Sequence, residues 1–256
     1  MSRRLLVVVV TALAAGATLV STAAAGHSWG NYHWARTANP FTLQVGDNMS
    51  GDWDPLLARA SSDWSRSNVL DTTVVAGRAR GKCRPTSGRI EVCNGNYGFN
   101  GWLGIAQIWI SGGVHITQAT TRVNDSYLSQ GYSTTNKQHV LCQEVGHDFG
   151  LHHQSESGAD LNTCMDYATA LDNPSPNQHD YDQLQTIYSH VDSFTTIGFA
   201  EPGLAGADAK PEKVERLDRI HDSTIEEHFA DGSKKVTHVF WAVPGAPRNH
   251  DHDHDE

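Results

Sequence analysis

The sequence predicts a mixed α/β (α+β) fold in which helices pack against a twisted mixed β-sheet. One observation is the order strand, helix, strand near the start, which favours parallel pairing with a right-handed crossover. Another is a later series of apolar segments of strand length. The third is a helix that stops at Gly150, the usual residue type just past a last helical turn. The expected strands are 41–45, 69–76, 89–92, 102–110 and 114–123, and the expected helices begin at Asp54, near Thr134 and at Ser175.

Residues 1–25 have the pattern of a secretory signal peptide. Arg3 and Arg4 precede a short apolar run, and small residues follow up to Ala25. The alternative, a membrane anchor, is disfavoured because the strongly apolar part is too short to span a bilayer. We therefore expect a secreted, extracellular protein without a membrane contact after signal cleavage.

The composition changes after residue 198. Residues 26–198 form the expected main domain, and 199–222, rich in Ala, Gly, Pro and charge, are expected to be a linker. Residues 223–244 are expected to form a β-hairpin around Asp231-Gly232, a type I′ turn signal. Residues 245–256 alternate His and Asp, which is typical of a disordered tail.

The formal net charge is −10, and loss of the signal peptide would remove two more positive charges. An acidic surface argues against nucleic acid and against anionic membranes as partners. We expect a monomer.

Four cysteines in an exported chain predict two disulfides. Of the three possible pairings we favour Cys83–Cys93, which closes a short loop, together with Cys142–Cys164. The alternative, a cysteine metal site, lacks paired C-x-x-C spacing.

The segment from Gln143 to His153 reads Gln-Glu-Val-Gly-His-Asp-Phe-Gly-Leu-His-His. Residues four apart lie about one helical turn, roughly 6 Å, apart on one face, so Gln143 and His147 can face one metal ion. Gly150 lets the chain turn, and His153 can then return as a third ligand. Three protein ligands plus one water is the arrangement that a catalytic zinc ion needs.

These residues resemble the zinc helix of the metzincin clan of zinc endopeptidases. Glu144, His147, Gly150 and His153 match the pattern H-E-x-x-H-x-x-G-x-x-H, and Cys164-Met165-Asp166-Tyr167 resembles the clan's Met-turn. Within the clan the chain looks most like bacterial, matrixin-like secreted proteases. The resemblance implies a metzincin-like sheet with a zinc-site helix, a Met-turn and a C-terminal helix, to which the hairpin is added. Gln143 departs from the pattern, because it replaces the first zinc-binding histidine.

The resemblance implies a secreted endopeptidase in which zinc activates a water and Glu144 acts as general base. Tyr167 would help to hold the transition-state oxyanion; alternatively it is a core tyrosine. An extracellular protein or peptide substrate would bind extended along the edge strand by β-augmentation. The competing interpretation is a catalytically silent binding or adhesion module that keeps this fold.

Three alternatives remain for Gln143. Its amide oxygen coordinates zinc weakly, or a water or Tyr167 takes its place beside His147 and His153, or the site is empty. His139 lies two turns from His147, about 12 Å along the axis, so we expect it to be a helix-surface residue. The spacing after Gly150 favours His153 over His152 as the ligand.

Overall fold

The computed structural model of the protein describes residues 26–78, 83–168, 170–198, 209–219 and 221–242. The expected signal peptide, residues 199–208 and 220 of the expected linker, and the His/Asp tail lie outside these residues. Within them, no helix has the length and apolar character needed to cross a membrane.

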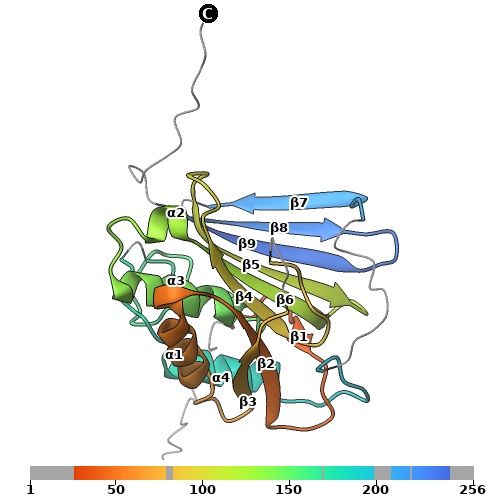
Figure 1. Cartoon of the computed structure of the whole chain (residues 1–256). Coiled ribbons are helices and arrows are strands. Elements are labelled where there is room, and N and C mark those ends of the chain that lie inside the picture. Colours follow the sequence, from red (N-terminus) through yellow and green to blue (C-terminus); the bar gives the residue numbers. More distant parts are fainter. Residues whose placement is uncertain (1–25, 79–82, 169, 199–208, 220, 243–256) are drawn as a thin grey trace, which may run out of the picture.

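The described strands form one nine-stranded mixed sheet, in the order β3-β2-β4-β6-β5-β9-β8-β7, with β1 paired to β6 (Figure 1). Pairing is parallel among β1, β2, β3, β4 and β6, and antiparallel from β6 through β5, β9 and β8 to β7. The mixed α/β prediction is therefore confirmed. The strands are β1 (His33–Trp34), β2 (Phe41–Asn48), β3 (Leu70–Ala76), β4 (Ile90–Gly95), β5 (Trp102–Ser111), β6 (His115–Asn124), β7 (Lys213–Asp218), β8 (Asp222–His228) and β9 (Lys234–Trp241).

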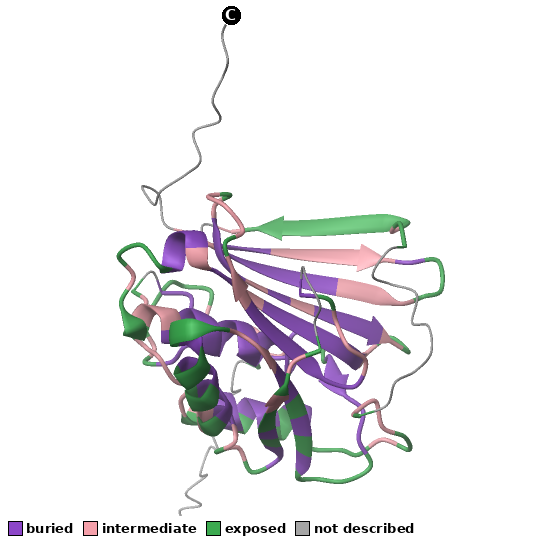
Figure 2. Cartoon of the chain, in the orientation of Figure 1, coloured by how far each residue is buried: buried purple, intermediate pink, exposed green. Residues whose placement is uncertain are grey.

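Helices cover one face of this sheet (Figure 1). α1 packs against β2, β3 and α3, and α3 packs against β5, β6 and β9. Between these layers lies the apolar core, so the central strands are buried while β7 at the far edge is exposed (Figure 2). The helices are α1 (Asp54–Trp64), α2 (Asp125–Leu128), α3 (Thr134–His147) and α4 (Gln178–Ile187), with a 3-10 turn η1 (Gly51–Trp53) before α1.

Helix α3 begins and ends where its sequence favours a helix boundary. Ser133 accepts from the backbone N–H of Asn136, and the Asn136 side chain accepts from the backbone of Ser133, a reciprocal capping box. At the other end Gly150 has φ +89°, and a Cβ there would lie 2.0 Å from the carbonyl oxygen of Tyr32. Only glycine fits this turn, which redirects the chain toward His153.

The C-terminal part differs from the expectation. Residues 213–218, assigned above to the linker, form strand β7, and β9 pairs directly with β5. The hairpin is therefore not a separate appendage but continues the main sheet. Its turn spans residues 229–233, longer than the two-residue type I′ turn predicted at Asp231-Gly232.

The prediction that His139 lies on the helix surface is wrong. Its side chain is fully buried, because α3 lies between the sheet and the loop that follows residue 164 and buries every residue from Gln138 to His147. Burial lowers the pKa of His139 to about 4.

This lowered pKa predicts an acid-dependent loss of stability. The unfolded chain protonates His139 below about pH 6.5, whereas the folded chain protonates it only near pH 4. The contribution of His139 to the free energy of unfolding is thus fully present above pH 6.5. It decreases by about 3 kcal/mol as the pH falls to 4. We expect His139→Leu to remove this part of the pH dependence in urea unfolding. The control is Gln138→Leu, a buried neighbour without a titratable group, and its free energy of unfolding should change with pH as that of the wild type does. If His139→Leu also kept the pH dependence of the wild type, the prediction would be contradicted.

Candidate metal centre

The end of α3 and the loop after it bring His147 and His153 together. Both imidazoles are buried, and their ring centroids lie 5.1 Å apart. His147 Nδ1 donates to the carbonyl oxygen of Leu151 at 2.9 Å. This bond fixes the tautomer that leaves Nε2 as an acceptor, and Nε2 has no hydrogen-bond partner among the described residues.

A third histidine, His238, comes from β9. Its backbone pairs with Ala106 of β5, and Val236 and Phe240, two residues away on either side, belong to the apolar core. His238 therefore points from the sheet toward α3. One ligand atom from each of His147, His153 and His238 lies within 4.8 Å of the others, so the three could hold a metal ion.

Burial favours the ligand form of two of these rings. It lowers the pKa of His147 and of His153 well below the usual range, and the neighbouring histidines lower both further. Both nitrogens of His153 lack a hydrogen-bond partner among the described residues. Buried polar atoms without partners are costly, so this cluster has the composition of a site that a cation would complete.

Glu144 and His238 form a buried pair. His238 Nδ1 donates to Glu144 Oε2 at 3.0 Å, and His238 Nε2 lies 3.4 Å from Asp222 Oδ2. Burial alone would lower the pKa of His238, but the two carboxylates raise it to about 9. Burial also raises the pKa of Glu144. Both shifts favour a proton held between Glu144 and His238.

Strand β5 closely approaches this pair. A Cβ on Gly104 would lie 2.7 Å from Cγ of Glu144. The missing side chain at Gly104 therefore makes the space that Glu144 fills. The second oxygen of that carboxylate, Oε1, is buried without a hydrogen-bond partner in the described chain.

Gln143 is tied to the turn that contains Met165. Its side-chain amide donates to the carbonyl oxygens of Cys164 at 2.8 Å and Asp166 at 3.0 Å. Because both partners can only accept, the NH₂ group must face them. Oε1 is buried without a hydrogen-bond partner in the described residues, so it is the one atom of Gln143 left to act as a ligand.

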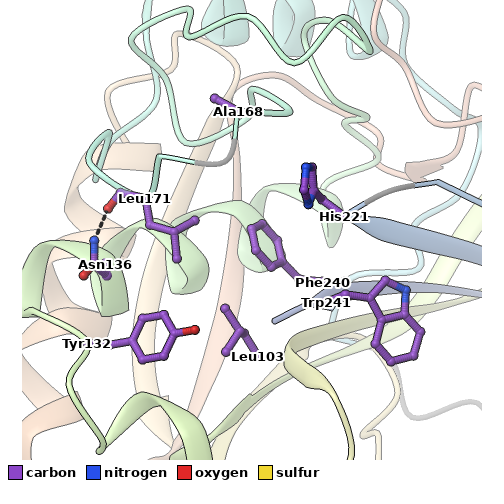
Figure 3. A pocket seen from close by; sticks show the side chains of 8 residues that line it. All are labelled: Leu103, Tyr132, Asn136, Ala168, Leu171, His221, Phe240 and Trp241. Carbon is purple, nitrogen blue, oxygen red and sulfur yellow. Dashed lines mark hydrogen bonds between the residues drawn. The ribbon is translucent and has the colours of Figure 1, made fainter. Parts of the chain in front are cut away.

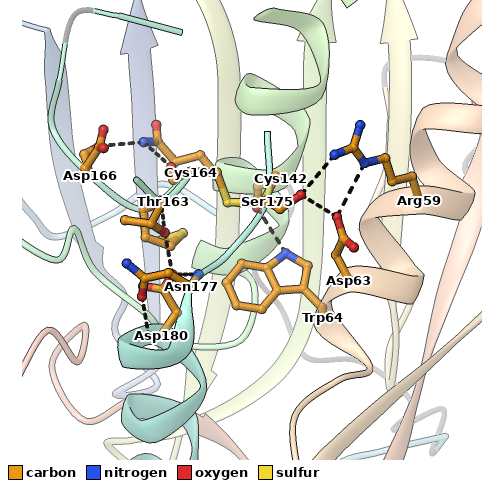
Figure 4. Close-up of a disulfide and its surroundings, with 12 residues drawn as sticks. Arg59, Asp63, Trp64, Cys142, Thr163, Cys164, Asp166, Ser175, Asn177 and Asp180 are labelled. Atoms are coloured by element: carbon orange, nitrogen blue, oxygen red, sulfur yellow. Dashed lines mark hydrogen bonds and ion pairs between the residues drawn. A yellow bond between two sulfur atoms is a disulfide. The ribbon is translucent and has the colours of Figure 1, made fainter. Parts of the chain in front are cut away.

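The disulfide between Cys142 and Cys164 joins α3 to the same turn (Figure 4). The structure also pairs Cys83 with Cys93, so both disulfides have the expected partners. Trp64 of α1 donates its indole N–H to the carbonyl oxygen of Cys142 at 3.2 Å. Met165 is fully buried, and its Sδ would lie 2.5 Å from a Cβ on Gly146. The turn is thus packed closely under α3.

Tyr167 contacts the C-terminal segment. Its hydroxyl accepts from the backbone N–H of His221 at 2.9 Å, while its ring centroid lies 5.3 Å from that of His153. The tyrosine therefore lies beside the cluster, with its hydroxyl bonded to the residue that precedes β8.

A cavity of about 180 Å³ lies between β5, β9, the start of α3 and the segment after Tyr167 (Figure 3). Phe240 projects into it, two residues beyond His238. The residues that line it are Leu103, Tyr132, Asn136, Ala168, Leu171, His221, Phe240 and Trp241.

Two of the three histidines, His147 and His153, were expected from the sequence, whereas His238 and Asp222 were not. A signal was present in Val236-Thr237-His238-Val239-Phe240, because alternate residues of a strand share a face. A histidine between Val236 and Phe240 must lie on their buried side. His152, the ring not favoured above, faces Glu156, with Nδ1 3.2 Å from a carboxylate oxygen.

No family model matches the chain, and no curated protein matches it. Among solved structures, this chain is similar to the structure of Myroilysin, with 13% sequence identity and a TM-score of 0.35. The match covers 60% of this chain and 82% of the Myroilysin chain. A likeness this weak supports no conclusion about fold or activity.

The two bonds from Gln143 predict a cost for its removal. Gln143→Leu would leave two buried carbonyl groups without their donor, so we expect a loss of about 1–3 kcal/mol in the free energy of unfolding. Urea denaturation with a chelator present measures this without a metal contribution. Gln138→Leu is the matched control, because the Gln138 amide is equally buried but makes no hydrogen bond in the described chain. Equal losses in the two variants would contradict the proposed tie.

Proposed function

We propose that the chain is a secreted, zinc-dependent endopeptidase and that the described conformation is its closed state. The observation that carries this proposal is the convergence of His147, His153 and His238 beside Glu144. The expected signal peptide and the two disulfides support export. An extracellular protein or peptide remains the proposed substrate, with no nucleic-acid or membrane partner.

The residues fit zinc by their chemistry. Imidazole nitrogens are preferred zinc ligands, and buried nitrogens without partners are available in all three rings. When bound, zinc would supply a Lewis acid that polarises a peptide carbonyl. Glu144 is the proposed proton carrier: its raised pKa suits a group that accepts a proton and returns it to the leaving amine.

The hairpin β8–β9 occupies the place proposed for substrate. An extended peptide would pair with β5, which would be an edge strand only without the hairpin, but β9 already pairs with β5 antiparallel from Trp102 to Ile110. His238 also holds one oxygen of Glu144, and Phe240 fills part of the cavity beside it. Substrate can therefore bind only after the hairpin leaves.

Displacement of the hairpin would remove His238 from the ion. We propose that Oε1 of Gln143 then becomes the third ligand, as its position one turn before His147 allows. An amide oxygen is a weaker zinc ligand than an imidazole nitrogen, so the open state should hold zinc less tightly. In this scheme His238 preserves the ion while the enzyme is closed.

The competing function is a catalytically silent binding module in which zinc only joins the hairpin to α3. The observation in its favour is the complete burial of the cluster, since a catalytic zinc needs a position open to substrate. The two functions differ in what happens when the hairpin is displaced.

Phe240→Asp tests this difference, because a buried carboxylate beside Leu103 and Leu171 should displace β9. We expect casein cleavage, in the presence of excess zinc, to rise at least tenfold above that of the intact protein. Adding Glu144→Gln to Phe240→Asp should abolish the gain.

Val214→Asp is the matched control, because it places the same charge on β7, the strand that pairs with β8, where Val214 is 55% exposed. It should leave cleavage at the level of the wild type. Circular dichroism checks that Phe240→Asp keeps the α3 layer. A folded Phe240→Asp protein that binds zinc and cleaves nothing would favour the silent module.

A further inference from the structure

A second group of metal-binding side chains lies away from His147, where the start of β6 meets the segments before β2 and after α4. Nε2 of His33, Nε2 of His190 and Oδ1 of Asp192 lie within 4.8 Å of one another. His115 adds a third imidazole, with Nε2 3.4 Å from the same Asp192 oxygen. We propose that these residues bind a second zinc ion, held by His33, His190 and Asp192 and completed by His115.

The spacing of the atoms suits zinc. Ligand atoms at zinc-bond length around a tetrahedral ion lie roughly 3.3 Å from one another. The His33 and His190 Nε2 atoms are 3.2 Å apart. Asp192 Oδ1 lies 3.7 Å from His33 Nε2 and 3.8 Å from His190 Nε2. Small side-chain rotations would bring all of these atoms to bonding distance.

The surroundings fix the ligands in the orientation that a metal requires. His33 Nδ1 donates to the carbonyl oxygen of Asn31 at 2.8 Å, which leaves the lone pair of Nε2 directed into the cluster. Asp192 Oδ2 accepts from the side chain of Arg36 at 3.1 Å and from its backbone N–H at 3.2 Å. The other oxygen, Oδ1, is then the one that faces the three imidazoles.

The site is accessible from solvent. The His190 side chain is 47% exposed, and a depression of about 270 Å³ lined by His33, His190, Asn31 and Val114 opens beside the cluster. An ion can therefore enter without unfolding the domain. Once bound, it would link three segments far apart in sequence, the function of a structural zinc site.

Zinc content of the full-length protein tests the inference. Protein equilibrated with zinc and then passed through a desalting column is expected to carry two equivalents, and His190→Ala to carry one. The His190 side chain is nearly half exposed, so its truncation should not impair folding. The His/Asp tail is unchanged in both proteins and contributes equally to each.

Two further variants make the result specific. His221→Ala removes a histidine outside every potential metal cluster of the described chain, and we expect its zinc content to equal that of the wild type. His238→Ala affects only the first site. If the first site binds no zinc, the wild type still holds one ion at the second site, and His190→Ala removes that ion. Zinc should also raise the melting temperature of His238→Ala by more than that of His190→Ala/His238→Ala, which keeps only the weakened first site. Equal zinc contents in the wild type and His190→Ala would overturn the proposal.

Discussion

The pairing of β9 with β5 is the interaction on which the candidate centre depends. It places His238 opposite Ala106 and turns its ring toward α3. Through His238 the strand also engages Glu144 and Asp222, and the residue before β8 bonds to Tyr167. Every group proposed for catalysis thus contacts the hairpin or lies beside it. The same hydrogen-bonded pairing that supplies a ligand also closes the edge at which a substrate would add a strand.

The opposite side of the centre is held by local restraints that do not involve the hairpin. The disulfide from Cys142, the two bonds from Gln143 and the packing of Met165 all connect α3 to one turn. Each of these restraints acts on α3 within five residues of His147. In the proposed open state, this fixed side would keep the helix that carries Glu144 in place while the hairpin moves away.

Much of the main domain could be predicted from local patterns. Alternating apolar residues identify β2, the capping residues and Gly150 delimit α3, and cysteine spacing gave the disulfide partners that the structure contains. Strand β7 was missed because both faces are exposed, so Val214 and Leu217 do not mark a buried side. The strand alternation around His238 marks its side chain as buried, but its place beside His147 depends on a pairing across more than a hundred residues, which no local pattern encodes. The direction of the Gln143 amide likewise depends on carbonyl groups that only the folded turn brings near.

We propose that His238, and not Gln143, completes the three-histidine set in the closed state. Zinc K-edge X-ray absorption counts the imidazoles around the ion, and His190→Ala protein confines the signal to the first site. We expect three imidazoles in His190→Ala and two in His190→Ala/His238→Ala, with weaker zinc binding in the latter. The same number of imidazoles with and without His238 would contradict it.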